Sequence, residues 1–380
     1  MYQIAMRAAL VAALSLAALA VHADTNAINR WHLKPFWEGT TMHGESCFFL
    51  EESTGAAPTS TLLFTPRKIL SVVHTATGTI YEEGRDYTLD KAARRLTLTK
   101  DSRIPFTTRA DYEPPIGKSG QLYRDGTRDI FFENEHLFHD LQVEVTYEHK
   151  KKDWSKLGGP VPEPAGDNLA ELNRKLEAGE ALTVCLLGDS ISFGLNASGI
   201  AGVAPHQPAY GDLFVQGLTA RFGSPIQFTN FSVSGMGAPW GIEQAPLVAE
   251  KKPDLAIIAF GMNDASGRFS PADFTANIQR IMDGIKAGHP ATSFIVISPM
   301  LGNADWKHAA PDLYPQYRDA LMTLRGPGVA VADLTSFWSV FLNRKRFVDI
   351  AGNGVNHPND FGYRVYAQVL LALFPESMKG

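Results

Sequence analysis

Residues 182–190 read LTVCLLGDS, and this stretch decides the fold. It begins with a mostly apolar run that ends at Leu187, as in a strand covered on both faces, and such strands occur in parallel sheets. Segments with helical spacing separate it from further predicted strands. Those strands occupy residues 226–231, 255–260, 293–298 and 329–334. The alternation predicts a three-layer α/β fold over residues 167–380, built on a parallel, flavodoxin-like sheet.

The helices between these strands carry their own signals. Residues 210–222 have a helical pattern, and a last helix is expected after Pro358. Ser270 is a good helix cap, and it is followed by Pro271 and, three residues after the cap, by Asp273. These signals predict that a helix begins directly after Ser270.

The residues before this region follow a different pattern. From residue 24 to about 149, turn residues separate short segments in which polar and apolar side chains alternate. In the clearest of them Leu141, Val143, Val145 and Tyr147 share one face. Several such strands predict an N-terminal all-β sandwich resembling a jelly roll. Residues 150–166 are rich in Pro and Gly, which favours a linker between the two domains.

The first residues resemble a targeting segment. Arg7 precedes an apolar run from Ala8 to Ala20, and residues 21–23 fit a small-x-small cleavage site. The run is shorter than the roughly 20 residues that span a bilayer. Residues 1–23 are therefore expected to be a cleaved signal peptide, and the mature chain is expected to be periplasmic or secreted, with no membrane span.

Composition excludes several classes of protein. The formal net charge is -5 and no basic stripe is present, which argues against nucleic-acid binding. Two cysteines, Cys47 and Cys185, are too few for a disulfide scaffold or a zinc site. The pattern implies neither a metal nor a cofactor.

Polar residues stand at the carboxyl ends of the predicted strands, the edge where active sites of such sheets lie. Ser190 follows the first strand in Gly-Asp-Ser, Gly235 follows the second, and Asn263 follows the third in Gly-Met-Asn-Asp. His357 precedes Pro358 near the C-terminus. Each motif alone is weak, since Ser190 could serve only as a helix cap, but together and in this order they are specific.

In these four motifs, from about residue 182 onward, the chain resembles the SGNH (GDSL-like) hydrolase family. The resemblance implies a serine esterase in which Ser190 is the nucleophile and His357 the general base. It also implies an oxyanion hole made by the backbone N–H groups of Ser190 and Gly235 and the side-chain amide of Asn263.

The sequence departs from the family at one position. The family has an aspartate three residues before its histidine, and Gly354 stands there. Orienting the imidazole requires an acceptor, which could be Asp349, Asp360 or a backbone carbonyl. Of these, Asp349 is the tentative third member of the triad.

The arrangement of β domain, linker and hydrolase domain resembles bacterial carbohydrate esterases, as do residues 188–198, 207–211 and 234–236. The resemblance implies removal of O-acetyl groups from an acetylated carbohydrate through an acyl-enzyme on Ser190. Trp240 and Trp306 lie in loops expected to flank the pocket, where they could contact sugar rings or simply pack. The alternatives are a lipid or thioester hydrolase, a sugar acetyltransferase, and a carbohydrate-binding protein whose hydrolase domain is inactive.

Overall fold

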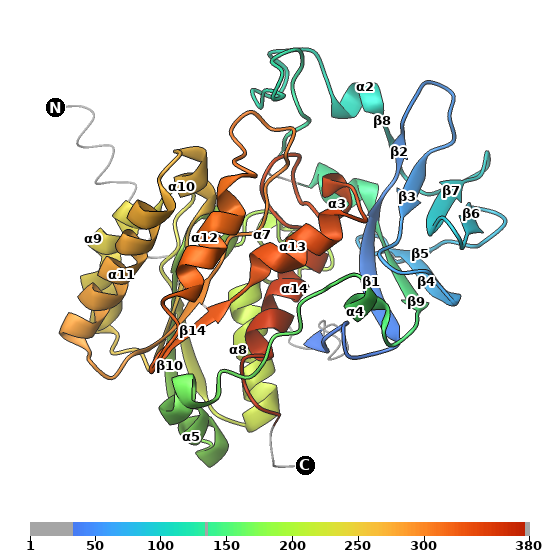
Figure 1. The fold of residues 1–380 in the computed structure, drawn as a ribbon. Helices are drawn as coiled ribbons and strands as arrows, with labels where there is room; N and C mark the ends of the chain where they lie inside the picture. The colour runs from blue at the N-terminus through green and yellow to red at the C-terminus, as the bar shows by residue number, and fades with distance from the viewer. Residues whose placement is uncertain (1–32, 134–135, 377–380) are drawn as a thin grey trace.

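The computed structural model describes residues 33–133 and 136–376 (Figure 1). The predicted signal peptide, residues 1–23, lies outside the described residues. Within the described part, no helix is both long enough and apolar enough to cross a membrane.

The predicted parallel sheet is present in the C-terminal part of the chain. Its strands run in the order β11-β10-β12-β13-β14, and every neighbouring pair is parallel. The strands are β10 (Leu182–Gly188), β11 (Ile226–Asn230), β12 (Leu255–Ala259), β13 (Ser293–Ile297) and β14 (Val329–Ala332). The order places β10, which ends at Gly188, between the two strands that follow it in the chain. The carboxyl ends of these three strands therefore meet at one edge of the sheet.

Helices cover both faces of this sheet. Helices α9 and α11 pack on each other, as do α8 and α14, and Figure 1 shows the two pairs on opposite sides of the strands. The longer helices are α5 (Ala170–Ala178), α8 (Tyr210–Phe222), α9 (Ala238–Glu250), α11 (Pro271–Gly288), α12 (Leu313–Met322), α13 (Leu334–Leu342) and α14 (Asp360–Leu371). The short ones are η2 (Gly166–Leu169), α6 (Ser190–Phe193), α7 (Ser198–Ala201), α10 (Met262–Ser266) and η3 (Phe347–Asp349). The predicted three-layer α/β class is confirmed, and the Ser270 hydroxyl caps α11 as expected.

The N-terminal part is a β domain, as predicted. Its two sheets have the strand orders β1-β9-β4-β5 and β6-β7-β3-β2-β8. All pairs are antiparallel except β2 with β8. The strands are β1 (Thr41–Phe48), β2 (Leu50–Glu51), β3 (Thr59–Thr61), β4 (Lys68–His74), β5 (Thr79–Ile80), β6 (Tyr87–Asp90), β7 (Arg95–Leu98), β8 (Thr107–Thr108) and β9 (Gln142–Glu148). Two short helices, α2 (Arg109–Tyr112) and α3 (Leu137–Leu141), join them.

The segment expected to be a linker is packed into the protein. Residues 150–166 contain the short helix α4 (Asp153–Lys156), and the Trp154 side chain is buried. Its indole ring lies against Phe36 of the N-terminal part and is stacked on Phe337 of α13, with centroids 4.9 and 5.2 Å away. Its Nε1–H donates to the Pro160 carbonyl at 2.7 Å. One continuous hydrophobic core therefore joins the β domain to the α/β domain.

Candidate active site

Ser190 is the first residue of α6, directly after β10. The helix is capped by its neighbour Asp189, whose Oδ1 accepts from the Ile191 N–H at 3.0 Å. Because Asp189 serves as the cap, the Ser190 hydroxyl is not needed for that purpose. A Cβ at Gly188 would lie 2.5 Å from the Ala259 carbonyl oxygen, so only glycine lets the strand turn here against β12.

The structure brings His357 to Ser190, although 167 residues separate them in the chain. His357 Nε2 lies 2.9 Å from Ser190 Oγ, within hydrogen-bond distance. Both side chains are almost completely buried, at 4% exposure. Burial lowers the pKa of His357 to about 4, because the charged imidazolium loses its hydration. At neutral pH the imidazole is therefore uncharged and able to accept a proton from the serine.

Two asparagines face the other nitrogen of the imidazole. His357 Nδ1 lies 2.7 Å from Asn196 Oδ1 and 2.8 Å from Asn353 Nδ2. Asn196 follows α6 and Asn353 belongs to the loop that carries His357, and both are buried. The sequence analysis missed both residues. No sequence motif marks Asn196, whose backbone is left-handed with a φ of 67°, a conformation that asparagine adopts more readily than most residues.

The structure corrects the expectation that Asp349 is the third member of the triad. Asp349 Oδ1 accepts from the Phe48 N–H at 3.1 Å and from the Ser60 hydroxyl at 2.9 Å. Its Oδ2 accepts from the Arg346 N–H at 3.1 Å. The carboxylate thus bonds to the β domain and to its own turn, while Asn196 lies at His357 Nδ1.

Asp360, the second carboxylate considered for this role, also bonds elsewhere. Its Oδ1 accepts from the Ser198 N–H at 2.9 Å. Asp360 therefore links the start of α14 to the start of α7, two elements that flank the serine and the histidine.

Gly354 cannot carry the family's aspartate in this fold. A Cβ built there would lie 1.9 Å from the Phe131 carbonyl oxygen and 2.8 Å from the Ile130 side chain. Backbone of the β domain thus occupies the space that a side chain would need. The departure from the family's motif has a steric cause.

The candidate oxyanion-hole groups lie just after three neighbouring strands: Ser190 begins α6 after β10, Gly235 lies in the loop after β11, and Asn263 lies in α10 after β12. The Ser190 N–H belongs to the first turn of a helix, where backbone donors have no partner within the helix. Gly235 is exposed, with a φ of 79°, a conformation that strains residues with a side chain. Asn263 Nδ2 donates to the Met236 carbonyl at 2.8 Å, and this amide nitrogen carries a second hydrogen. The bond ties Asn263 to the loop that contains Gly235.

A model of the GDSL-like Lipase/Acylhydrolase family matches residues 186–365, a range that includes Ser190, Asn263 and His357. This part of the chain is a GDSL-like hydrolase domain. The match confirms the resemblance drawn from the four motifs and the assignment of the chain as an ester hydrolase.

Several solved structures are similar to part of this chain. A lipase from a goat rumen metagenome has a TM-score of 0.43 and 14% identity, over 52% of this chain and 99% of its own. A two-domain esterase active on acetylated mannans has a TM-score of 0.44 and 18% identity, over 57% of each chain. A carbohydrate esterase family 3 protein from Talaromyces cellulolyticus has a TM-score of 0.38 and 16% identity, over 50% of this chain and 94% of its own. A search of curated proteins found no match.

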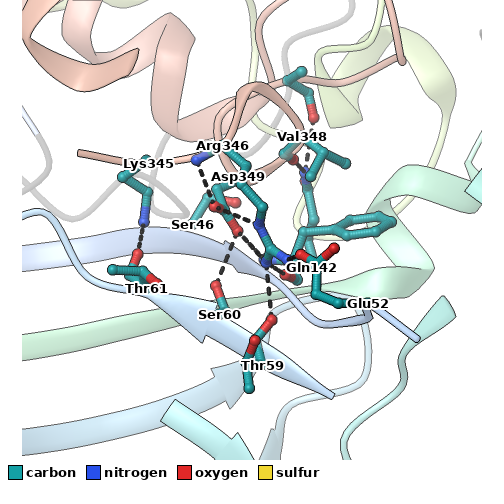
Figure 2. Close-up of polar contacts among 12 residues, drawn as sticks. Ser46, Glu52, Thr59, Ser60, Thr61, Gln142, Lys345, Arg346, Val348 and Asp349 are labelled. Atoms are coloured by element: carbon teal, nitrogen blue, oxygen red, sulfur yellow. Dashed lines mark hydrogen bonds and ion pairs between the residues drawn. The ribbon is translucent and has the colours of Figure 1, made fainter. Parts of the chain in front are cut away.

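The GDSL-like domain is bonded to the β domain at the start of the loop that carries His357, residues 345–359 (Figure 2). Lys345 Nζ donates to the Thr61 carbonyl at 2.7 Å and also pairs with the buried Glu45 carboxylate. Arg346 Nη2 donates to the carbonyls of Phe48, at 2.6 Å, and Thr59, at 2.8 Å. Together with the bonds of Asp349, these contacts attach residues 345–349 to strands β1 and β3.

Further bonds attach the same loop of the GDSL-like domain to β9 and β1. Gln142 Nε2 donates to the carbonyls of Val348, at 3.2 Å, and Ala351, at 2.7 Å. Asn359 Nδ2 donates to the Ser46 hydroxyl at 2.8 Å. The loop from residue 345 to residue 359 is thus held from both ends by the β domain, and His357 lies within it.

The two tryptophans expected near the pocket have packing contacts. Trp306 is 8% exposed, and its Nε1–H donates to Gln121 Oε1 of the β domain at 2.9 Å. It belongs to a small hydrophobic cluster with Tyr112 and Ile130. Trp240 lies on α9, half-buried, with its ring edge-on to Phe260 at 6.5 Å. Trp306 thus packs the GDSL-like domain against the β domain, while Trp240 packs within the GDSL-like domain. Contact of either ring with substrate stays a prediction.

A small cavity of about 10 Å³ lies among core residues beside the start of α6. Asp189, Ile191, Ser192 and Tyr366 are among the residues that line it, whereas Ser190 and His357 are not. Such a volume holds about one water molecule. In residues 33–133 and 136–376, no group of His, Cys, Asp and Glu side chains is arranged to bind a metal.

Proposed function

We propose that the protein is an exported serine esterase that removes O-acetyl groups from a carbohydrate through an acyl-enzyme on Ser190. The observation that supports the proposal most directly is the 2.9 Å contact between Ser190 Oγ and His357 Nε2, at the carboxyl edge of the sheet in a GDSL-like hydrolase domain. A nucleophile within hydrogen-bond distance of a neutral base is the arrangement that covalent ester hydrolysis requires.

The reaction proceeds in two halves. In the first, His357 Nε2 takes the proton of Ser190 while the hydroxyl oxygen bonds to the ester carbonyl carbon. The negative charge that develops on the carbonyl oxygen would be stabilised by the N–H groups of Ser190 and Gly235 and the amide of Asn263. The intermediate collapses as the bond to the sugar oxygen breaks, and this oxygen receives the proton from His357. In the second half, water repeats the sequence and releases acetate.

The carbohydrate as substrate rests on the motifs shared with bacterial carbohydrate esterases, around residues 188–198, 207–211 and 234–236. The apolar segment from Ala8 to Ala20 supports export, which would bring the enzyme to polysaccharides outside the cell.

The decisive experiment measures acetate release from a panel of acetylated polysaccharides, with the wild type and the Ser190→Ala variant side by side. The expected result is release by the wild type from at least one polysaccharide and none above background by the variant. Release that survives Ser190→Ala would refute the proposal. A wild type that binds the polysaccharides without cleaving any ester would identify the protein as a binding protein.

A chain-length series of nitrophenyl esters separates the proposal from a lipid or thioester hydrolase. The proposed enzyme cleaves the acetate ester fastest, with kcat/KM falling as the acyl chain lengthens. A maximum at a long acyl chain would contradict the proposed substrate class while leaving Ser190 as nucleophile. Adding a free sugar as acceptor and looking for its acetate ester tests for acetyl transfer.

A further inference from the structure

The imidazole of His357 has two neutral amides at the nitrogen where a hydrolase triad has a carboxylate. Asn196 presents an oxygen to Nδ1 and Asn353 presents a nitrogen. Nδ1 either carries a hydrogen or offers a lone pair, so it cannot bond to both amides at the same time. Which amide it bonds to decides whether Nε2 is free to accept the proton of Ser190.

The orientation of the Asn353 amide is fixed by the backbone. Its Oδ1 accepts from the N–H groups of Val355 at 2.9 Å, Asn356 at 2.9 Å and His357 at 3.2 Å. Turning this amide over would break all three bonds. Asn353 can therefore offer Nδ1 only a donor, which suits the tautomer whose hydrogen is on Nε2 and which cannot activate the serine.

Asn196 presents an acceptor to His357 Nδ1, whereas Asn353 presents a donor. Its Nδ2 faces the Glu133 carbonyl at 3.4 Å, so its Oδ1 points toward His357. An acceptor at Nδ1 stabilises the tautomer with the hydrogen there, and then Nε2 has the lone pair that takes the serine proton. It also stabilises the imidazolium that forms when this proton has been transferred.

We propose that Asn196 is the positioning residue that takes the place of the missing carboxylate, with its amide oriented by the Glu133 backbone of the β domain. The inference rests on the proposed function and names a residue of the same site. Gly354 explains why the carboxylate is missing, since the Phe131 carbonyl occupies the space of its side chain. Phe131, whose carbonyl excludes an aspartate at residue 354, and Glu133, whose carbonyl orients Asn196, belong to the same short segment of the β domain.

The replacement is uncharged, and that has a measurable consequence. Among the described residues, no carboxylate hydrogen-bonds to the imidazole, whose side-chain partners are Ser190, Asn196 and Asn353. His357 thus lacks the bonded carboxylate that raises the basicity of the imidazole in a carboxylate triad. Installing such a charge at residue 196 should shift the pH dependence of the reaction.

The test uses two variants chosen for the backbone of residue 196. Its φ of 67° suits Asn, Asp and Gly, so Asn196→Asp and Asn196→Gly avoid the strain that alanine would bring. Asn196→Gly removes the acceptor and is expected to lower kcat about 100-fold or more, with KM little changed. Asn196→Asp keeps an acceptor. It is expected to move the midpoint of the acid limb in the pH profile of kcat/KM upward by about one to three pH units.

A carboxylate at residue 196 would move the acid limb whatever role the wild-type amide has, so the loss of turnover in Asn196→Gly with the fold kept is the readout that separates positioning from a structural role. Thermal unfolding of each variant checks that the fold is kept. Turnover by Asn196→Gly within about threefold of wild type, or an acid limb in Asn196→Asp that stays where the wild type has it, would overturn the proposal.

A second readout does not depend on turnover. With 15N-histidine labelling, NMR reports the tautomer and the titration of His357 directly. Nδ1 is expected to carry the hydrogen in the wild type, and the titration is expected to move to higher pH in Asn196→Asp. A hydrogen on Nε2 in the folded wild type would contradict the proposal. Because this measurement needs no substrate, it separates failure of this inference from failure of the proposed esterase activity.

Discussion

Asp349→Asn distinguishes a catalytic carboxylate from one that holds the fold together. The substitution removes the charge that pairs with Arg346 and replaces Oδ2, an acceptor of the Arg346 N–H, with a donor. Asp349 is completely buried. Breaking a buried ion pair costs about 3–5 kcal/mol, and a buried N–H left without a partner is part of that cost. Because Arg346 keeps its bond to Glu52 at 2.8 Å, the lower end, about 3 kcal/mol, is expected.

The pH dependence of this effect has a defined sign. Burial alone would raise the pKa of Asp349, but Arg346 and Lys345 lower it, and the pKa lies below its ordinary value. A carboxylate with a lowered pKa stabilises the folded state above the pKa of the unfolded chain, near 3.8, and this contribution is lost as the pH falls. The stability difference between wild type and variant should be full at pH 7 and shrink below about pH 4.

Urea unfolding measures the stability, and steady-state kinetics measures the activity. Both experiments are run at a temperature well below the melting temperature. We expect kcat/KM within about threefold of wild type, with an unshifted acid limb, since Asp349 has no bond to His357. The matched control is Asp312→Asn, which breaks an ion pair with Arg268 whose side chains are more than half exposed and should leave stability unchanged. Turnover that falls by about 100-fold or more while stability is unchanged would refute the structural role.

Two further predictions concern His357 and Gly354. Burial lowers the pKa of His357 to about 4. The kcat/KM of the wild type should therefore stay constant from neutral pH down to about pH 5 and fall to half near pH 4, which a pH–rate profile measures. A midpoint near 6.5 would contradict the burial argument. Gly354→Asp, which restores the family's residue, should lower the melting temperature and the activity, because its Cβ would lie 1.9 Å from the Phe131 carbonyl oxygen; a variant that is both stable and faster than wild type would refute this account.

Much of the α/β domain could be predicted from the sequence, because its signals are local. Buried parallel strands are largely apolar, as β10, β12, β13 and β14 are, and β11 is a partly exposed edge strand. All five predicted segments are strands, with ends within two residues of the prediction. The helix predicted for residues 210–222 has those bounds, and Ser270 caps α11. Spacing alone also indicated that Ser190, Gly235 and Asn263 follow strands of one sheet.

The parts that could not be predicted depend on contacts between distant segments. Asp349 stands close to His357 in the chain, but its partners Phe48 and Ser60 come from the β domain about 290 residues earlier. Asn196 carries no motif, and its role arises only when the chain brings it to His357. The Pro and Gly of residues 150–166 predicted a linker, but the burial of Trp154 depends on aromatic residues of α13, far along the chain.

The shared aromatic core has a consequence for how the chain is made. Phe36 and Trp154 leave the ribosome long before Phe337 and Phe341, the α13 residues against which they pack. Until residues 337–341 have been synthesised, the earlier aromatic rings lack these partners and expose apolar surface that can aggregate. The amino-terminal half therefore depends on the carboxyl-terminal quarter to complete its interior, and a chain interrupted between them would leave a product in need of chaperones.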